Sequence, residues 1–313
     1  MSVSKGMRVG VLMGGMSTER DVSMKSGKAV LEALRVRGWD AVAVDVGPDL
    51  PARLVSQEVE VCWIALHGQF GEDGCVQGLL EIMRIPYTGT GVGGSAVAID
   101  KVTTKRLLED TAVSLPGDWI WRAGGDIPEG ITYPVVAKTP EGGSTLGIEI
   151  CASEAELEAA LPRLASFDEE VLLEAFVDGT EITVAVLDGE PLPVVAILPE
   201  SGFFDFEAKY TKGATRYVVP AELPAEVTAQ AQRDAVIAFK TLGLWGIARA
   251  DFIVNDDGIP MFLEVNTIPG MTATSLSPMA GISAGLDFEE IVERVLLGAR
   301  LQIVRRDEPG GPE

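Results

Sequence analysis

The chain has 313 residues, which exceeds the size at which one hydrophobic core keeps growing, so two or three subdomains are expected. Hydrophobic residues make up 47% and charged residues 23% of the chain, a globular balance, and no run of about 18 uncharged apolar residues indicates a membrane span. The net charge of −22 argues against nucleic acid as a partner, because that partner requires a basic surface. Three cysteines, odd in number and without metal-like spacing, favour a reducing cytoplasm.

Residues 1–92 have the pattern of a small α/β domain with a mostly parallel sheet. Strands are predicted at residues 7–13, 41–46 and 61–66, and helices at residues 22–35 and 78–83. Gly14 and Gly15 lie between the first strand and the first helix, where they indicate the tight turn that opens a βαβ unit.

A glycine-rich stretch at residues 89–94 marks a predicted boundary, and residues 93–178 form a second, α+β unit. Its strands are predicted at residues 133–139, 148–151 and 171–176, and its helices at residues 100–109 and 155–164.

Residues 179–304 form the third predicted unit, followed by a disordered tail at residues 305–313. Strands are expected at residues 181–187, at 193–198 and twice within 246–266, and helices at 225–242 and 288–301. Residues 199–217 show little periodicity and several aromatic side chains; a loop of that length in a compact domain is often a lid.

The most informative segment is the hairpin predicted within residues 246–266, whose turn is Asn255-Asp256-Asp257-Gly258. Pairing Val254 with Ile259 places Arg249 opposite Glu264. Because side chains alternate across a sheet, four polar residues share one face (Arg249, Asp251, Glu264 and Asn266) and six apolar residues share the other (Ala250, Phe252, Val254, Met261, Leu263 and Val265).

The polar face of this hairpin has the chemistry of a magnesium site. Asp251, Glu264 and Asn266 offer oxygen ligands within about 7 Å of one another, and Mg²⁺ in nucleotide sites is usually held by one or two carboxylates plus substrate phosphates. Arg249 beside them could neutralise a transferring phosphoryl group. The alternative is a solvated polar face with an Arg–Glu cross-strand pair.

Candidate phosphate contacts lie in the middle unit. Lys138 ends an apolar strand immediately before a glycine-rich loop at residues 140–147, and exposed loop N–H groups there can cradle phosphates. Lys101 begins a helix after the glycine-rich stretch. No GxxxxGK[ST] pattern is present, which excludes a P-loop nucleotide site.

Two carboxylates and the single histidine each have a functional and a structural interpretation. Glu174 lies among apolar residues and Glu181 follows it seven residues later; such a carboxylate binds a ribose hydroxyl or adenine amine, or forms a buried salt bridge. His67 follows a strand at the edge where α/β sheets bind ligands, or it is a structural histidine.

Several segments, in one order along almost the whole chain, resemble D-alanine–D-alanine ligases. They are Gly14-Gly-Met-Ser-Thr-Glu-Arg-Asp-Val-Ser23, Leu66-His-Gly-Gln-Phe-Gly-Glu-Asp-Gly74, Pro86-Tyr-Thr-Gly-Thr-Gly91, Asp100-Lys101, Phe206-Glu-Ala-Lys-Tyr210 and Glu264-Val-Asn-Thr-Ile-Pro-Gly-Met-Thr272. The last segment and the hairpin are shared with ATP-grasp ligases more widely, whereas the first two and Lys209-Tyr210 narrow the resemblance to this family.

The resemblance implies an α/β (α+β), three-domain ATP-grasp fold that holds ATP between its central and C-terminal domains. It also implies a cytoplasmic, ADP-forming ligase of peptidoglycan synthesis, commonly a homodimer, that uses two D-alanines, ATP and two Mg²⁺, with Mn²⁺ as an alternative metal. The first D-alanine carboxylate attacks the γ-phosphate, and the amine of the second D-alanine attacks the resulting acyl phosphate.

The same resemblance implies roles for individual residues. Glu19, Ser144, Tyr210, Arg249 and the backbone of Gly270 would be catalytic; His67, Lys209, Ser275 and Leu276 would bind D-alanine; Lys101, Lys138, Glu174, Phe176, Val177, Glu181, Phe204 and Lys209 would bind ATP; Asp251, Glu264 and Asn266 would hold the metals. Glu19 would take the ammonium group of the first D-alanine, and Ser144 and Tyr210 would join it in ordering the closed lid.

The chain also departs from the family pattern. Phe204 and Phe206 stand where tyrosines are frequent, the loop at residues 139–147 differs from Pro-x-x-x-Gly-Ser-Ser-Val-Gly, and Ile268 replaces a frequent serine. Three alternatives stay open: another ATP-grasp carboxylate–amine ligase, a D-alanine–D-lactate ligase, which Tyr210 disfavours, and a nucleotide-binding module without turnover.

Overall fold

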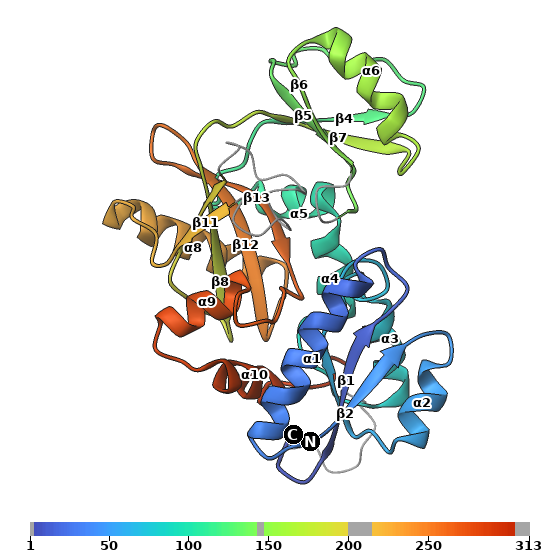
Figure 1. Cartoon of the computed structure of the whole chain (residues 1–313). Coiled ribbons are helices and arrows are strands. Elements are labelled where there is room, and N and C mark those ends of the chain that lie inside the picture. The colour runs from blue at the N-terminus through green and yellow to red at the C-terminus, as the bar shows by residue number, and fades with distance from the viewer. Residues whose placement is uncertain (1–2, 143–146, 200–214, 304–313) are drawn as a thin grey trace, which may run out of the picture.

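The computed structural model describes residues 3–142, 147–199 and 215–303, which form three sheets with flanking helices (Figure 1). The N-terminal sheet has the order β2 (Asp40–Val46), β1 (Arg8–Gly14), β3 (Val61–Ile64), and all its pairs are parallel. This parallel sheet confirms the α/β prediction for the first part of the chain.

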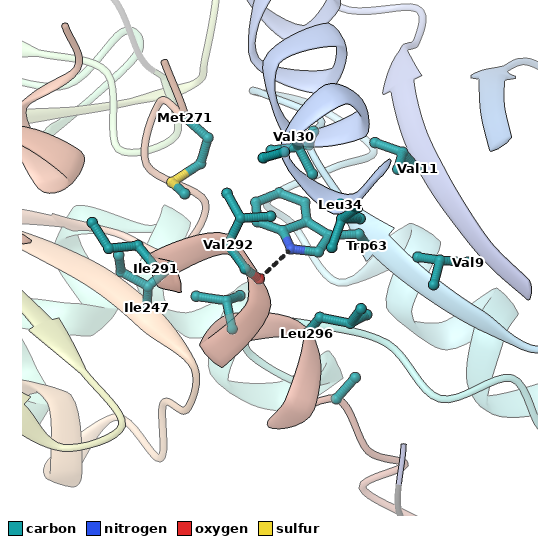
Figure 2. Packing of buried hydrophobic residues seen from close by; sticks show 14 of the residues in the cluster. Val9, Val11, Val30, Leu34, Trp63, Ile247, Met271, Ile291, Val292 and Leu296 are labelled. Atoms are coloured by element: carbon teal, nitrogen blue, oxygen red, sulfur yellow. Dashed lines mark hydrogen bonds between the residues drawn. The ribbon is translucent and has the colours of Figure 1, made fainter. Parts of the chain in front are cut away.

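Helices cover both faces of the N-terminal sheet, as a parallel sheet requires. Helix α1 (Arg20–Val36) packs on one face together with α10 (Phe288–Leu297), from the far end of the chain. The other face packs against α2 (Leu50–Ser56) and α3 (Cys75–Met83). In Figure 2, Trp63 of β3 lies among side chains of α1 and α10, and its indole N–H donates to the Val292 carbonyl at 3.3 Å.

The central sheet is antiparallel, with the order β4 (Asp118–Arg122), β7 (Glu170–Ala175), β5 (Val135–Lys138), β6 (Ile148–Cys151). Helix α6 (Glu154–Leu164) covers one face, where its leucines pack on alternate residues of the strands. In Figure 1 this unit forms the top of the molecule. The opposite face of β5 and β7 is therefore available to line a site.

The C-terminal sheet has the order β11 (Thr215–Val218), β10 (Val195–Pro199), β8 (Thr180–Leu187), β12 (Ile247–Val254), β13 (Pro260–Asn266), with β9 (Glu190–Pro191) paired to β8. One face packs on α8 (Ala225–Thr241), α4 (Val92–Ile99) and α5 (Lys101–Leu108). Helix α9 (Leu276–Ser283) packs against β8.

Several elements differ from the sequence-based expectation. Helix α4 begins inside the glycine-rich stretch, and α2 and α9 are short helices that were not predicted. Strand β11 occupies the end of the segment expected to be a loop; residues 200–214 lie outside the described residues. Helix α10 ends at Leu297 rather than at residue 301, because Arg300 pairs with Tyr87 beside the N-terminal sheet. Within the described ranges, no helix is both long and apolar enough to cross a membrane.

Candidate functional site

A pocket lies between the central sheet and the C-terminal sheet. We call its two sides the central-sheet wall (Pro116, Val136, Lys138, Ile148, Glu174, Ala175, Phe176 and Val177) and the hairpin wall (Arg249, Asp251, Ile253, Leu263 and Glu264). Glu181, Ile197 and Leu276 complete the lining. Nine of the predicted site residues line this one pocket: Lys138, Glu174, Phe176, Val177, Glu181, Arg249, Asp251, Glu264 and Leu276.

Strand alternation explains the central-sheet wall. Val135 and Ala137 point into the core under α6, so Val136 and Lys138 face the pocket. The register pairs Val136 with Glu174, which sets the Glu174 carboxylate diagonally across from Lys138. This wall is mostly apolar, as a slot for a flat heterocycle would be, with one lysine and one carboxylate in it.

The Glu174 carboxylate is held by two lysines. Lys138 Nζ forms an ion pair with Oε2, and Lys105 Nζ forms another with Oε1. Burial raises the pKa of Glu174, but Lys138 and Lys105 outweigh this and hold the pKa below its ordinary value, so the carboxylate is ionised at neutral pH. The buried salt bridge that the sequence left open for Glu174 is therefore present.

The hairpin wall is organised around Asp251. Arg249 Nε and Nη2 donate to the two oxygens of Asp251 at 2.8 and 2.7 Å. Thr183, paired with Asp251 across β8 and β12, donates its hydroxyl to Oδ1 at 2.6 Å. Burial lowers the pKa of Arg249, but Asp251 and Glu264 raise it above its usual value, so the guanidinium stays charged.

The predicted hairpin register is wrong. Arg249 pairs with Asn266 and Asp251 pairs with Glu264, while beyond them Phe252 pairs with Phe262. A β-bulge at Leu263 takes up the difference.

The bulge changes the predicted faces only in part. The four polar residues still share the pocket face, as predicted. Phe262, fully buried against Phe252, replaces Leu263 on the core face, and Leu263 lines the pocket. Met261 pairs with Ile253, a pocket-lining residue, so it too is on the face opposite to the predicted one.

Two of the metal-ligand candidates carry negative charges that a cation would balance. Asp251 and Glu264 lie directly opposite each other, an arrangement that is destabilising for like charges. Lys101 Nζ offsets part of this at 3.3 Å from Glu264 Oε2, and it also donates to the Gly142 carbonyl at 2.7 Å. Asn266 Oδ1 accepts from Ile268 N at 2.9 Å. These oxygen donors fit Mg²⁺ completed by substrate phosphates.

The loop motifs of the N-terminal unit form a second group beside the pocket. Glu19 is the N-cap residue of α1, and a Cβ placed on Gly68 would lie only 2.8 Å from its Oε2, so the loop after β3 approaches it closely. His67 is buried, with Nδ1 3.8 Å from Glu72 Oε1. The negative charge of Glu72 in turn helps to raise the pKa of Arg249 on the hairpin wall, after the larger effects of Asp251 and Glu264.

A serine joins His67 to the C-terminal unit. Ser26 Oγ lies 3.1 Å from His67 Nε2 and accepts a hydrogen bond from Met271 N at 3.2 Å. The neighbouring Gly270 approaches Ser275 so closely that a Cβ there would lie 3.1 Å from Ser275 Oγ. Ser275 is the N-cap residue of α9, and its Oγ accepts from Thr272 N at 3.1 Å.

Three residues that hold site groups in place were not predicted from the sequence: Ser26, Lys105 and Thr183. Lys105 could have been found, because it stands one helical turn after Lys101 in a predicted helix. Ser26 and Thr183 act on partners 41 and 68 residues away, so no local pattern marks them. Four predicted residues lie outside the described residues: Ser144, Phe204, Lys209 and Tyr210.

A second cleft is unsuited to a polyanion. Its lining includes five carboxylates and one guanidinium: Asp100, Glu141, Asp168, Glu169, Glu170 and Arg122. Burial, and then Asp100 and Asp168, raise the pKa of Glu141, as expected where negative charges gather. A nucleotide polyphosphate would be repelled there, so of these two hollows the pocket between the two walls suits a nucleotide better.

A pocket between two antiparallel sheets, with a lysine on one wall and paired carboxylates on the other, is the arrangement of an ATP-grasp protein. Residues 121–297 match the family model described as D-ala D-ala ligase C-terminus, and residues 46–90 match the one described as D-ala D-ala ligase N-terminus. The chain belongs to the D-alanine–D-alanine ligase family.

Individual relatives agree over nearly their whole length. The D-alanine–D-alanine ligase of Syntrophotalea carbinolica is 48% identical over 299 residues, covering 94% of this chain and 97% of the relative. That of Geobacter sulfurreducens is 45% identical, with 96% of each chain covered. The crystal structure of the Bacillus anthracis D-alanine–D-alanine ligase superposes with a TM-score of 0.84 at 33% identity, covering 94% of this chain and 97% of that one. The same enzyme complexed with ATP gives 0.83 at 31% identity.

Proposed function

We propose that this chain joins two D-alanines to D-alanyl-D-alanine at the expense of ATP, as a step of peptidoglycan precursor synthesis. The observation that carries the proposal is the convergence at one pocket of an apolar slot with Lys138 and Glu174 and a hairpin with Arg249, Asp251 and Glu264. Glu72, which lies in the same loop as His67, acts electrostatically on Arg249 of that pocket, so a small amino acid and a nucleotide would meet there. The names of the relatives supply the substrate class.

The nucleotide would lie between the two walls. Its base would occupy the apolar slot near Val136, Ile148, Phe176 and Val177, and Glu181 would reach the ribose. Lys138 and Lys101 would contact the phosphates, since both ammonium groups are buried beside the pocket or its hairpin wall. A phosphate is a stronger partner for these lysines than the neutral carbonyl of Gly142 that Lys101 now contacts.

Asp251, Glu264 and Asn266 would hold two Mg²⁺, or Mn²⁺ in their place. The metals would neutralise the charge of the β- and γ-phosphates, which repels an attacking carboxylate. Arg249 would stabilise the acyl phosphate, because its guanidinium is held by Asp251 on the pocket side of the hairpin.

The remaining groups would handle the two amino acids. Glu19 would bind the ammonium group of the first D-alanine, and His67 would lie beside it. The first carboxylate attacks the γ-phosphorus, and ADP leaves. The amine of the second D-alanine, held by Ser275 and Leu276, then attacks the acyl carbon. The Gly270 N–H would stabilise the tetrahedral oxyanion before phosphate leaves.

Other parts of the proposal rest on motifs and composition. Ser144 and Tyr210 would order a lid with Glu19, and Lys209 and Phe204 would contact the substrates and ATP. We also propose domains at residues 1–92, 93–178 and 179–304, a homodimer and a cytoplasmic location. The free thiols of Cys62, Cys75 and Cys151 support a reducing compartment, and light scattering on the purified chain would measure the oligomeric state.

The test is phosphate release from Mg·ATP by the purified chain with D-alanine, L-alanine, D-lactate plus D-alanine, or no addition, combined with product mass. We expect release that requires D-alanine and yields the dipeptide mass. An ester product would reassign the second-substrate site to D-lactate. ATP binding without release under any condition would instead support a nucleotide-binding module. The Glu264→Ala variant controls for contaminating ATPases.

A further inference from the structure

Lys105 on α5 is a fully buried cation that neither the sequence-based analysis nor the proposed mechanism uses. None of its surface is exposed. Its Nζ is ion-paired with Glu174 Oε1 and donates to the Pro116 carbonyl at 3.2 Å. Both partners line the nucleotide pocket, whereas Lys105 does not, so it stands directly behind the central-sheet wall.

The charges of this group do not cancel. Lys105 and Lys138 each carry one positive charge and Glu174 carries one negative charge, which sum to +1 in a largely buried setting. Burying a charge is costly unless it is paired, and one lysine would be enough to neutralise one carboxylate. A pair that served only the core would not need the second lysine.

The excess charge is directed toward the pocket. Glu174 offers one oxygen to each lysine, and only Lys138 reaches the pocket lining. Burial lowers the pKa of Lys105, while the contact with Glu174 works against this change. Without Lys105, both oxygens of Glu174 could interact with Lys138. Lys138 and Glu174 together would then have no net charge, and they would attract an anion less strongly.

We propose that Lys105 is a positioning residue of the nucleotide site, which holds Glu174 and the Pro116 carbonyl in place and leaves the charge of Lys138 available to the ATP phosphates. The inference rests on the ATP-dependent function proposed above. Lys105 acts through its two partners and does not touch the nucleotide.

The test measures ATP and ADP dissociation constants by calorimetry in Mg²⁺, and the KM values for ATP and D-alanine, in Lys105→Met and Lys105→Gln. Both variants remove the charge, and the glutamine can keep a donor for Pro116. We expect ATP affinity to fall about tenfold or more in both variants, as the loss of one nearby charge at intermediate dielectric predicts. The KM for D-alanine should stay within about twofold, since the effect of a charge declines with distance and screening.

Lys240→Met is the matched control, because it removes an exposed lysine near the end of α8 and changes net charge equally. Unchanged ATP affinity in a Lys105 variant with wild-type circular dichroism would overturn the proposal. A parallel loss of affinity for ATP and D-alanine would also overturn it, because general destabilisation predicts that result. If Lys105→Met does not fold, Lys105→Gln decides. If the wild-type chain binds ATP but does not ligate D-alanine, the proposed ligation is wrong. The role of Lys105 is still tested in that case, because the ATP dissociation constants do not depend on turnover.

Discussion

The two walls of the proposed nucleotide pocket differ in the charge of their side chains. Behind and within the central-sheet wall, Lys105, Lys138 and Glu174 sum to +2 − 1 = +1. On the hairpin wall, Arg249, Asp251 and Glu264 sum to +1 − 2 = −1, and Lys101 on α5 offsets this charge through its ion pair with Glu264. The central-sheet wall can therefore bind a polyphosphate directly, whereas the hairpin wall would bind it through a cation. We expect the first wall to determine nucleotide affinity and the second to determine catalysis.

The walls also differ in how their charges are fixed. The central-sheet wall buries its ion pairs almost completely, so its groups are held before any ligand arrives. On the hairpin wall, Glu264 keeps about a third of its side chain exposed, at 34%. A change on the first wall should thus alter ATP binding, and a change on the second should alter metal binding and turnover.

The largest expected effect is that of Glu264→Ala. We predict a loss of turnover of about a thousandfold or more, because the proposed metals lose a ligand and the γ-phosphate loses charge neutralisation. Steady-state kinetics at saturating Mg²⁺ measures it, with ADP affinity as the control for an intact central-sheet wall. Near-normal turnover at saturating Mg²⁺ would remove Glu264 from the metal site.

Thr183→Val should weaken metal binding about tenfold to a hundredfold, since the variant keeps the shape of the side chain but loses the hydroxyl that orients Asp251. Electron paramagnetic resonance of Mn²⁺ bound with ATP analogues measures the dissociation constant without turnover. Thr241→Val, at an exposed position on α8, is the control. Unaltered Mn²⁺ affinity would show that Asp251 is positioned by Arg249 alone.

Asp234 on α8 is a contrasting case, a buried carboxylate whose Oδ2 has no hydrogen-bond partner among the described residues. Burial raises its pKa to about 6. The folded state therefore binds the proton more tightly than the unfolded state, and Asp234 reduces stability as pH rises from about 4 through 6.

Asp234→Asn should raise the free energy of unfolding at pH 7.5 by on the order of 1–2 kcal/mol. The gain should shrink below about pH 5, where the wild-type carboxylate is protonated. Urea denaturation at several pH values measures it. If the gain in the free energy of unfolding is the same at every pH, the ionised form of Asp234 is not what destabilises the wild-type protein.

The smallest expected effect is that of Leu263→Ala. The bulged Leu263 places apolar surface on the hairpin wall, so its truncation should raise the KM for ATP several-fold, about 1 kcal/mol, with kcat unchanged. Ile259→Ala, in the exposed turn of the same hairpin, is the control. An equal loss of kcat would mean that the bulge positions the neighbouring Glu264 rather than the nucleotide.

Most of the fold and much of the site were predictable because periodicity and motif residues are local signals. The parallel N-terminal sheet, the hairpin and its polar face follow from alternation. The bulge at Leu263 could not be predicted in this way. Asp251 and Glu264 share one face of the hairpin both in a regular register and in a register with one extra residue, so the pattern does not distinguish the two.

The contacts that span the chain were the least predictable. Helix α10 packs on the N-terminal sheet across more than 200 residues, as the Trp63–Val292 hydrogen bond shows. The ion pair between Lys105 and Glu174 joins α5 to β7. The pattern of each segment alone indicates only a surface helix and an apolar strand. Tertiary pairing of this kind has no local signature.

In the proposed reaction, the first carboxylate is activated as an acyl phosphate in the pocket between the two walls. The most direct measurement supplies D-alanine labelled with ¹⁸O in its carboxylate and analyses the released phosphate by mass spectrometry. We expect one labelled oxygen in phosphate for each dipeptide formed, because the attacking carboxylate oxygen leaves with the phosphorus. Unlabelled phosphate alongside dipeptide would contradict it, since water rather than the carboxylate would then have attacked ATP.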